Sequence, residues 1–164
     1  MCRGGAMSVL RTKFSQAEGK TGGSAISRAP LPPTRKHLID CNVVILSKDS
    51  TPSASFFAER VSRWLTPASR SVHMHYGGGS APIDVERTDI VIFMFYRHFE
   101  TAVHRLIADF RRSNPNVYAV ILSATPNDVE AGKADLVLDK GQIGDSLPVQ
   151  LRDMLCNDPL GAKS

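Results

Sequence analysis

The turn after the first strand-like segment is where a nucleotide-binding domain would carry its phosphate loop. That loop has the pattern G-x-x-x-x-G-K-[ST], whose backbone amides surround the phosphates while the lysine neutralises them and the hydroxyl holds magnesium. Here Asn42–Ser47 (NVVILS) is followed by KDSTPSA, which lacks both glycines and the motif lysine. Asp49 adds a negative charge, and Pro52 removes an amide donor. The later segment Ala124–Asn127 likewise lacks the lysine and carboxylate of a base-recognition motif. These residues predict no nucleotide binding and no cofactor.

Three positions invite comparison with the receiver domains of two-component signalling. A receiver needs a phospho-accepting aspartate at the end of its third strand, a hydroxyl after the fourth and a lysine after the fifth. Ser123 and Lys140 match the hydroxyl and the lysine, but Met94 stands where the acceptor should be. This combination describes a pseudo-receiver that cannot transfer a phosphoryl group, and it is kept as an alternative interpretation.

Other residue types that could do chemistry are few. His73 and His75 lie two residues apart on a strand-like segment and would point to one face, as two metal ligands could. Asp84 or Glu86 would have to fold back to complete a set, so an exposed edge strand explains the pair more simply. We expect no metal site and no enzyme, since no nucleophile elbow or Cys-His couple is present. An enzyme with a site at the strand ends would have to use Lys48, Asp49, Tyr96 and Lys140.

Alternating strand-like and helix-like patterns must position these residues, and they predict a layered α/β domain. The expected strands are Asn42–Ser47, Ser71–His75, Thr88–Phe95, Val117–Ser123 and Asp135–Leu138; the expected helices begin near Pro52 and cover Arg97–Arg112 and Leu147–Leu155.

The segment Tyr76–Arg87 decides the predicted topology. It includes three consecutive glycines and a proline, a composition that cannot form a helix. A parallel crossover needs about a dozen residues and usually contains a helix. We therefore expect an antiparallel hairpin here, which gives a three-layer, small-GTPase-like mixed sheet with one antiparallel edge strand and degenerate nucleotide motifs.

Composition predicts one folded domain between two tails. The chain has 164 residues, 42% of them hydrophobic, and its longest apolar run, Ile90–Tyr96, is far shorter than the roughly 20 residues of a membrane span. Three widely spaced cysteines suggest neither disulfides nor a metal motif. Residues 1–37 hold seven basic residues and one acid, although the rest of the chain is slightly acidic. We expect a disordered basic tail at 1–36, the domain at 37–158 and a disordered end at 159–164.

The basic tail allows two further interpretations. It could make weak, salt-sensitive contacts with nucleic acid, or it could be a mitochondrial transit peptide, although its Gly and Pro residues disfavour the amphipathic helix of such a peptide.

Several short segments resemble the centromere protein M family, small GTPase-like pseudoenzymes of the inner kinetochore. The similar segments are Met7–Arg11 (MSVLR), Asn42–Leu46 (NVVIL), Val72–Met74 (VHM), Thr88–Phe95 (TDIVIFMF) and Leu122–Thr125 (LSAT). They are short and mostly apolar, and the loose similarity covers about two thirds of the chain.

The resemblance implies a non-catalytic subunit of the constitutive centromere-associated network, located in the nucleus at the centromere. Such a subunit would bind inner-kinetochore partners, namely centromere protein I and subunits of the H and K types, and would support kinetochore assembly and chromosome segregation. It would bind no membrane, no nucleotide and no specific nucleic-acid sequence. The candidate partner contacts are apolar or aromatic residues at the ends of elements: Tyr96, Pro115, Val117 and Leu155.

Overall fold

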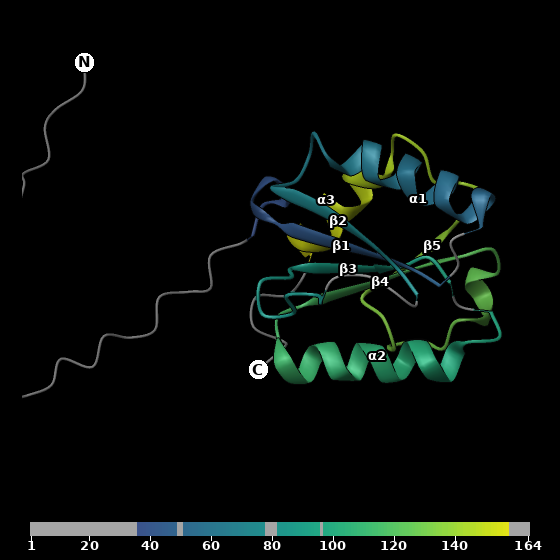
Figure 1. Ribbon diagram of the computed structural model, residues 1–164. Helices are drawn as coiled ribbons and strands as arrows, with labels where there is room; N and C mark the ends of the chain where they lie inside the picture. Colours follow the sequence, from purple (N-terminus) through teal and green to yellow (C-terminus); the bar gives the residue numbers. More distant parts are fainter. Residues whose placement is uncertain (1–35, 49–50, 78–81, 96, 158–164) are drawn as a thin grey trace, which may run out of the picture. The chain divides into compact units, whose positions relative to one another are not determined.

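The structure is a computed structural model that describes residues 36–48, 51–77, 82–95 and 97–157. The chain divides into two units, Met1–Leu31 and Pro32–Ser164, and every described residue belongs to the second. The predicted tails at 1–36 and 159–164 lie outside the described residues, apart from Lys36. In chain order the elements are η1 (Leu38–Asp40), β1 (Asn42–Ser47), α1 (Pro52–Leu65), β2 (Ser71–Tyr76), β3 (Ile90–Phe93), α2 (Glu100–Ser113), β4 (Tyr118–Ser123), η2 (Pro126–Asp128), β5 (Leu136–Asp139) and α3 (Leu147–Asn157). Figure 1 labels the strands and the α-helices.

The described strands form one sheet in which every neighbouring pair is parallel, in the order β2-β1-β3-β4-β5. The α/β class is confirmed, but the predicted antiparallel edge strand is wrong. β2 runs parallel to β1, from the pair Asn42↔Ser71 to the pair Ser47↔Tyr76. This order is that of flavodoxin and CheY, a doubly wound arrangement.

The error came from treating a crossover as if it required a helix. The connection between β2 and β3 spans residues 77–89, and an extended chain of that length reaches about 40 Å. β3 is only four residues long, roughly 13 Å. An extended segment can therefore run from the carboxyl end of β2 back to the edge of the sheet where the parallel strand β3 begins. Ile83 and Val85 of this crossover pack against the core on the α2 side of the sheet. The described end of the crossover, residues 82–89, is thus held by packing on a face of the sheet that a crossover helix usually covers.

Hydrogen bonds fix the end of the crossover before β3. The side-chain hydroxyl of Thr88 donates to the carbonyl of Asp84 at 2.7 Å. The side-chain amide of Asn114, just after α2, donates to the carbonyl of Thr88 at 2.8 Å. These bonds satisfy backbone carbonyls that neither a helix nor a strand could satisfy.

The sheet divides the core into two sides. Figure 1 shows α1 and α3 on one face and α2 on the other. Alternate residues of β1 serve each side, since Val43 and Ile45 join the α1–α3 core whereas Val44 and Leu46 join the α2 core. The helices contribute stripes at helical spacing: Ala58, Val61 and Leu65 from α1, Val103, Ile107 and Phe110 from α2, and Leu147, Leu151 and Leu155 from α3.

α2 begins at Glu100, not at Arg97 as the sequence predicts. His98 has a φ of 68°, a left-handed conformation that no α-helix accommodates. Its backbone N–H donates to the Glu100 carboxylate at 3.1 Å, which stabilises this turn just before the helix.

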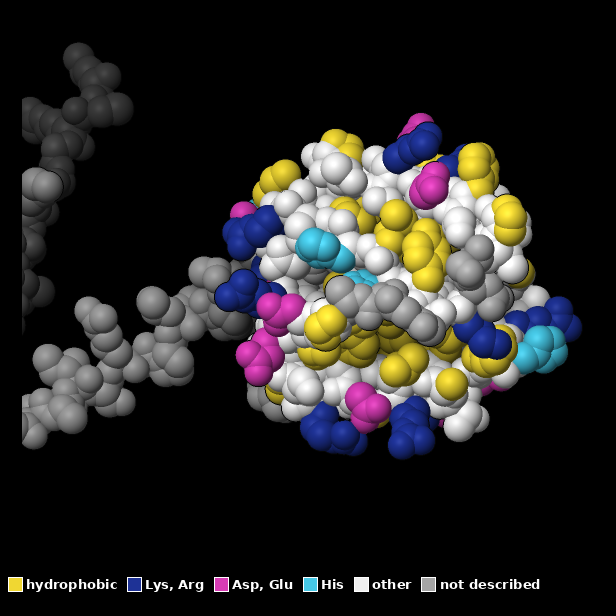
Figure 2. All heavy atoms as spheres, in the orientation of Figure 1, with side chains coloured by type: hydrophobic (Ala, Val, Ile, Leu, Met, Phe, Trp, Pro, Cys, Tyr) yellow, Lys and Arg dark blue, Asp and Glu magenta, His cyan; other side chains and the backbone are white. Residues whose placement is uncertain are grey.

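Charges on the face in Figure 2 are interspersed around the rim, and apolar side chains gather between the sheet and α2. This face has no continuous basic surface that would suit a phosphate backbone. Within the described part of the chain, no helix combines the length and the apolar character needed to cross a bilayer.

Candidate functional site

All five strands end at the same edge of the sheet, because they are parallel. In this strand order, ligands bind where the chain changes direction, between the carboxyl ends of β1 and β3. Lys48 follows β1, Met94 follows β3, and Lys140 follows β5, while Ser123 ends β4. The three positions compared with a receiver are therefore brought to one edge by the fold.

Lys140 extends from the end of β5 to the end of β3. Its backbone N–H donates to the carbonyl of Ser123 at 2.9 Å, and its ammonium donates to the carbonyl of Met94. The ammonium also lies 5.8 Å from the ring centre of Phe57. Burial lowers the pKa of Lys140 below its ordinary value of 10.5. The ammonium of Lys140 is therefore already bonded to a backbone carbonyl, that of Met94, a buried residue that is 5% exposed.

Lys48 is held in a similar way on the other side of the switch point. Its ammonium lies 3.4 Å above the centre of the Phe99 ring, and Phe99 packs edge-on against Phe95 at 6.0 Å. Aromatic rings therefore occupy the neighbourhood of both described lysines at this edge. Asp49 and Tyr96, the other residues considered for an enzyme, lie outside the described residues.

Gly77 has a structural purpose that the sequence did not reveal. Its N–H donates to the carbonyl of Ser47 at 2.9 Å, and a Cβ at this position would lie only 2.6 Å from the backbone oxygen of Lys48. Only glycine fits this close approach between the ends of β1 and β2. Gly77 is therefore a position that the packing of the strand ends requires to be glycine; Gly78 and Gly79 lie outside the described residues.

The histidine pair occupies edge strand β2, as the sequence predicts. His73 and His75 point to the same face, because they are two residues apart on a strand. Among the described residues, no group of three or more His, Cys, Asp or Glu side chains gathers closely enough to hold a metal ion.

The two described cysteines differ in exposure. Cys41 is 0% exposed, and burial, with a smaller contribution from the Asp89 charge, raises the pKa of its thiol to about 11. Its thiol donates to the carbonyl of His37 at 3.3 Å. Cys156 is exposed. The thiolate is the nucleophilic form of cysteine, and the raised pKa keeps the Cys41 thiol protonated at neutral pH, so we interpret Cys41 as a structural residue.

The predicted partner contacts differ in how far the structure exposes them. Val117 is 0% exposed and Leu155 is 4% exposed, so the core uses both side chains and neither offers a surface to a partner. Pro115 is exposed in the turn before β4. Tyr96 lies outside the described residues. Of the four, Pro115 is the described residue that stays a candidate.

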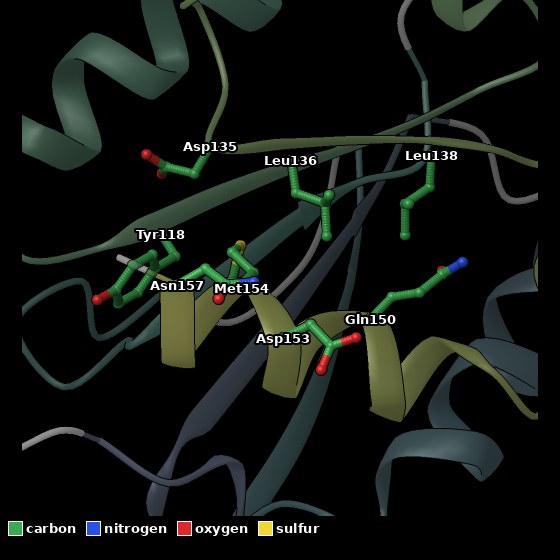
Figure 3. A pocket seen from close by; sticks show the side chains of 8 residues that line it. All are labelled: Tyr118, Asp135, Leu136, Leu138, Gln150, Asp153, Met154 and Asn157. Carbon is green, nitrogen blue, oxygen red and sulfur yellow. The ribbon is translucent and has the colours of Figure 1, made fainter. Parts of the chain in front are cut away.

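A surface groove that the sequence did not predict lies between edge strand β5 and α3. Its volume is about 450 Å³. Figure 3 shows Leu136 and Leu138 pointing from β5 toward α3. The lining residues are Tyr118, Asp135, Leu136, Leu138, Gln150, Asp153, Met154 and Asn157. We call this the β5–α3 groove. Its residues come from the start of β4, from β5 and the residue before it, and from α3, and only the fold brings them together.

The chain matches no protein-family model, no curated protein and no solved structure. Its class therefore rests on the architecture: an α/β protein with five parallel strands in doubly wound order.

The buried amine of Lys140 gives a prediction about pH. Between its lowered folded pKa and 10.5 the folded chain holds fewer protons than the unfolded chain, so this amine makes stability rise with pH in that window. In Lys140→Met this contribution is absent. The free energy of unfolding of the variant minus that of the wild type should therefore fall as pH rises from 7 to 10.5, as measured by urea denaturation.

Cys41 does not disturb this comparison. Its raised pKa makes stability fall as pH rises between 9.0 and about 11, but it does so in both proteins and cancels from the difference. A difference that stays constant across the pH series would show that the Lys140 amine is solvated.

Proposed function

We propose that this chain is a non-catalytic interaction module, a folded α/β domain that acts by binding protein partners. The observation that carries the proposal is the state of the strand-end edge. The Lys140 ammonium donates to the carbonyl of Met94, and the Lys48 ammonium lies on the Phe99 ring. A catalytic edge of this fold would direct such groups to a substrate.

A test of this proposal uses the full chain with two chemical probes. Acetyl phosphate supplies a phosphoryl group to receiver domains, and GTP is the ligand of an active G domain. We expect no covalent phosphorylation by intact mass spectrometry with the first and no heat of binding by calorimetry with the second. A mass increase of one phosphoryl group, or saturable GTP binding, would contradict the proposal that the chain is a non-catalytic module.

The partner class that we propose comes from the resemblance to the centromere protein M family. Membership of this family would place the chain in the nucleus at the inner kinetochore, with centromere protein I and subunits of the H and K types as partners. The parallel β2 removes the antiparallel edge as an argument for a G domain, so this assignment is supported by the short similar segments alone. Affinity purification and imaging of the tagged full chain in dividing cells should recover these subunits and give centromeric foci. Diffuse signal without them would reject this partner class.

The pseudo-receiver is the second candidate, favoured by the parallel strand order and by the joint position of Ser123 and Lys140. In this case the partner would be a signalling protein, and binding would not depend on phosphorylation. The same purification distinguishes the two, because the kinetochore subunits would be absent and a signalling protein would take their place.

A further inference from the structure

β5 is the last strand of the sheet, paired with β4 along one side. An edge strand presents backbone N–H and C=O groups on its other side, and a segment of another chain can pair with them. The residues of β5 are partly exposed along its whole length, Leu136–Asp139. The backbone of this strand is therefore suited to the addition of an extended peptide.

The β5–α3 groove lies beside this edge and would receive alternate side chains of such a peptide. Leu136, Leu138 and Met154 give the groove an apolar lining. Successive residues of a strand point to opposite faces, so every second residue of an added strand would face α3. An apolar residue at these positions would cover the exposed parts of the leucines.

The polar side of the groove determines the charge of the occupant. Asp135 and Asp153 line it, and the lining contains no lysine or arginine. Arg111 already pairs with Asp135 at 3.2 Å. Asp153 is exposed, and within the described part of the chain no ion pair is formed by its carboxylate. It can therefore accept a cation from outside.

Gln150 adds an independent observation. Its side-chain oxygen is buried and accepts no hydrogen bond in the described part of the chain. A buried acceptor without a donor is costly, so native structures seldom leave one. Gln150 lies in the lining one helical turn before Met154, so a donor that reaches its buried oxygen has to enter between α3 and β5.

From these observations we propose that the β5–α3 groove binds an extended segment of a partner protein, which adds to the sheet beside β5. The segment alternates apolar residues with others and carries a lysine or arginine that pairs with Asp153. This inference rests on the proposed function as an interaction module and specifies its surface and the chemistry of its partner.

The experiment selects binders of the full chain from a phage library of random twelve-residue peptides. The strongest binder is then synthesised, and its affinity is measured by fluorescence anisotropy. We expect enriched peptides with alternating apolar residues and at least one lysine or arginine. Amide shifts in ¹⁵N spectra should be confined to β5, α3 and their neighbours. A version of the peptide that is N-methylated at alternate residues should bind about tenfold more weakly, because it cannot pair as a strand.

Two variants with the same change of charge provide the decisive comparison. Asp153→Lys should weaken binding by about tenfold or more, since it replaces the acceptor by a cation. Asp109→Lys, on α2 at the opposite face of the sheet, should bind as the wild type does. Circular dichroism checks that both variants are folded.

Several results would overturn the inference: no enriched peptide, enriched peptides without basic residues, shifts outside the groove, or equal affinities for the two variants. None of these would touch the proposed function, which fails instead if the chain is phosphorylated or binds GTP. The two claims are therefore tested separately.

Discussion

Replacing Phe93 with alanine should lower the free energy of unfolding by about 4 kcal/mol, the usual cost of truncating a fully buried phenylalanine. Phe93 is 0% exposed at the end of β3. Its ring meets Phe95 edge-on at 6.3 Å and Phe110 at 6.4 Å, so alanine would leave a cavity between the sheet and α2. The remaining side chains of the core on this side of the sheet would line that space, and a packed core relaxes only partially into such a cavity. Urea denaturation followed by circular dichroism measures the loss.

Phe56→Ala is the matched control. Phe56 lies on α1 with 61% of its surface exposed, so the same truncation should change stability by no more than about 0.5 kcal/mol. Equal effects for the two variants would mean that the aromatic cluster around Phe93 is not packed as the structure has it.

The elements of this fold could be predicted from the sequence because their signals are local. The apolar run Asn42–Ser47 is β1 with the predicted bounds, and Pro52 begins α1 as expected for proline in a first helical turn. The direction of β2 could not be predicted in this way. It depends on the path of residues 77–89, and composition excludes a helix there without excluding an extended crossover.

The candidate site was predictable to a similar extent. Ser123 and Lys140 were singled out by their positions after strands, and the fold brings them together through the bond from the Lys140 amide to the Ser123 carbonyl. Val117 and Leu155 were wrong as surface residues, because residue type alone does not tell whether the core has already used an apolar side chain. The β5–α3 groove has no local signal, since it exists only because β5 is an edge strand.

Asp89 is the last residue of the crossover before β3, and Asp89→Ala should cost about 3 kcal/mol of stability. The carboxylate is almost buried just before β3. It accepts a hydrogen bond from the backbone N–H of Asn42 at 2.7 Å and pairs with the Lys36 ammonium. Alanine would leave that amide without its acceptor at the start of β1, where the crossover returns to the sheet. Thermal and urea denaturation should both report the loss.

Lys36→Ala separates the two partners of this carboxylate. The Lys36 side chain is 48% exposed, so solvent screens its charge, and we expect its removal to cost less than about 1 kcal/mol. Asp89→Asn retains one oxygen that can accept from Asn42 and should fall between the two alanine variants. If Lys36→Ala were as damaging as Asp89→Ala, the ion pair would be the main stabilising contact. The crossover would then be anchored mainly by Lys36, and the Asn42 amide would contribute little.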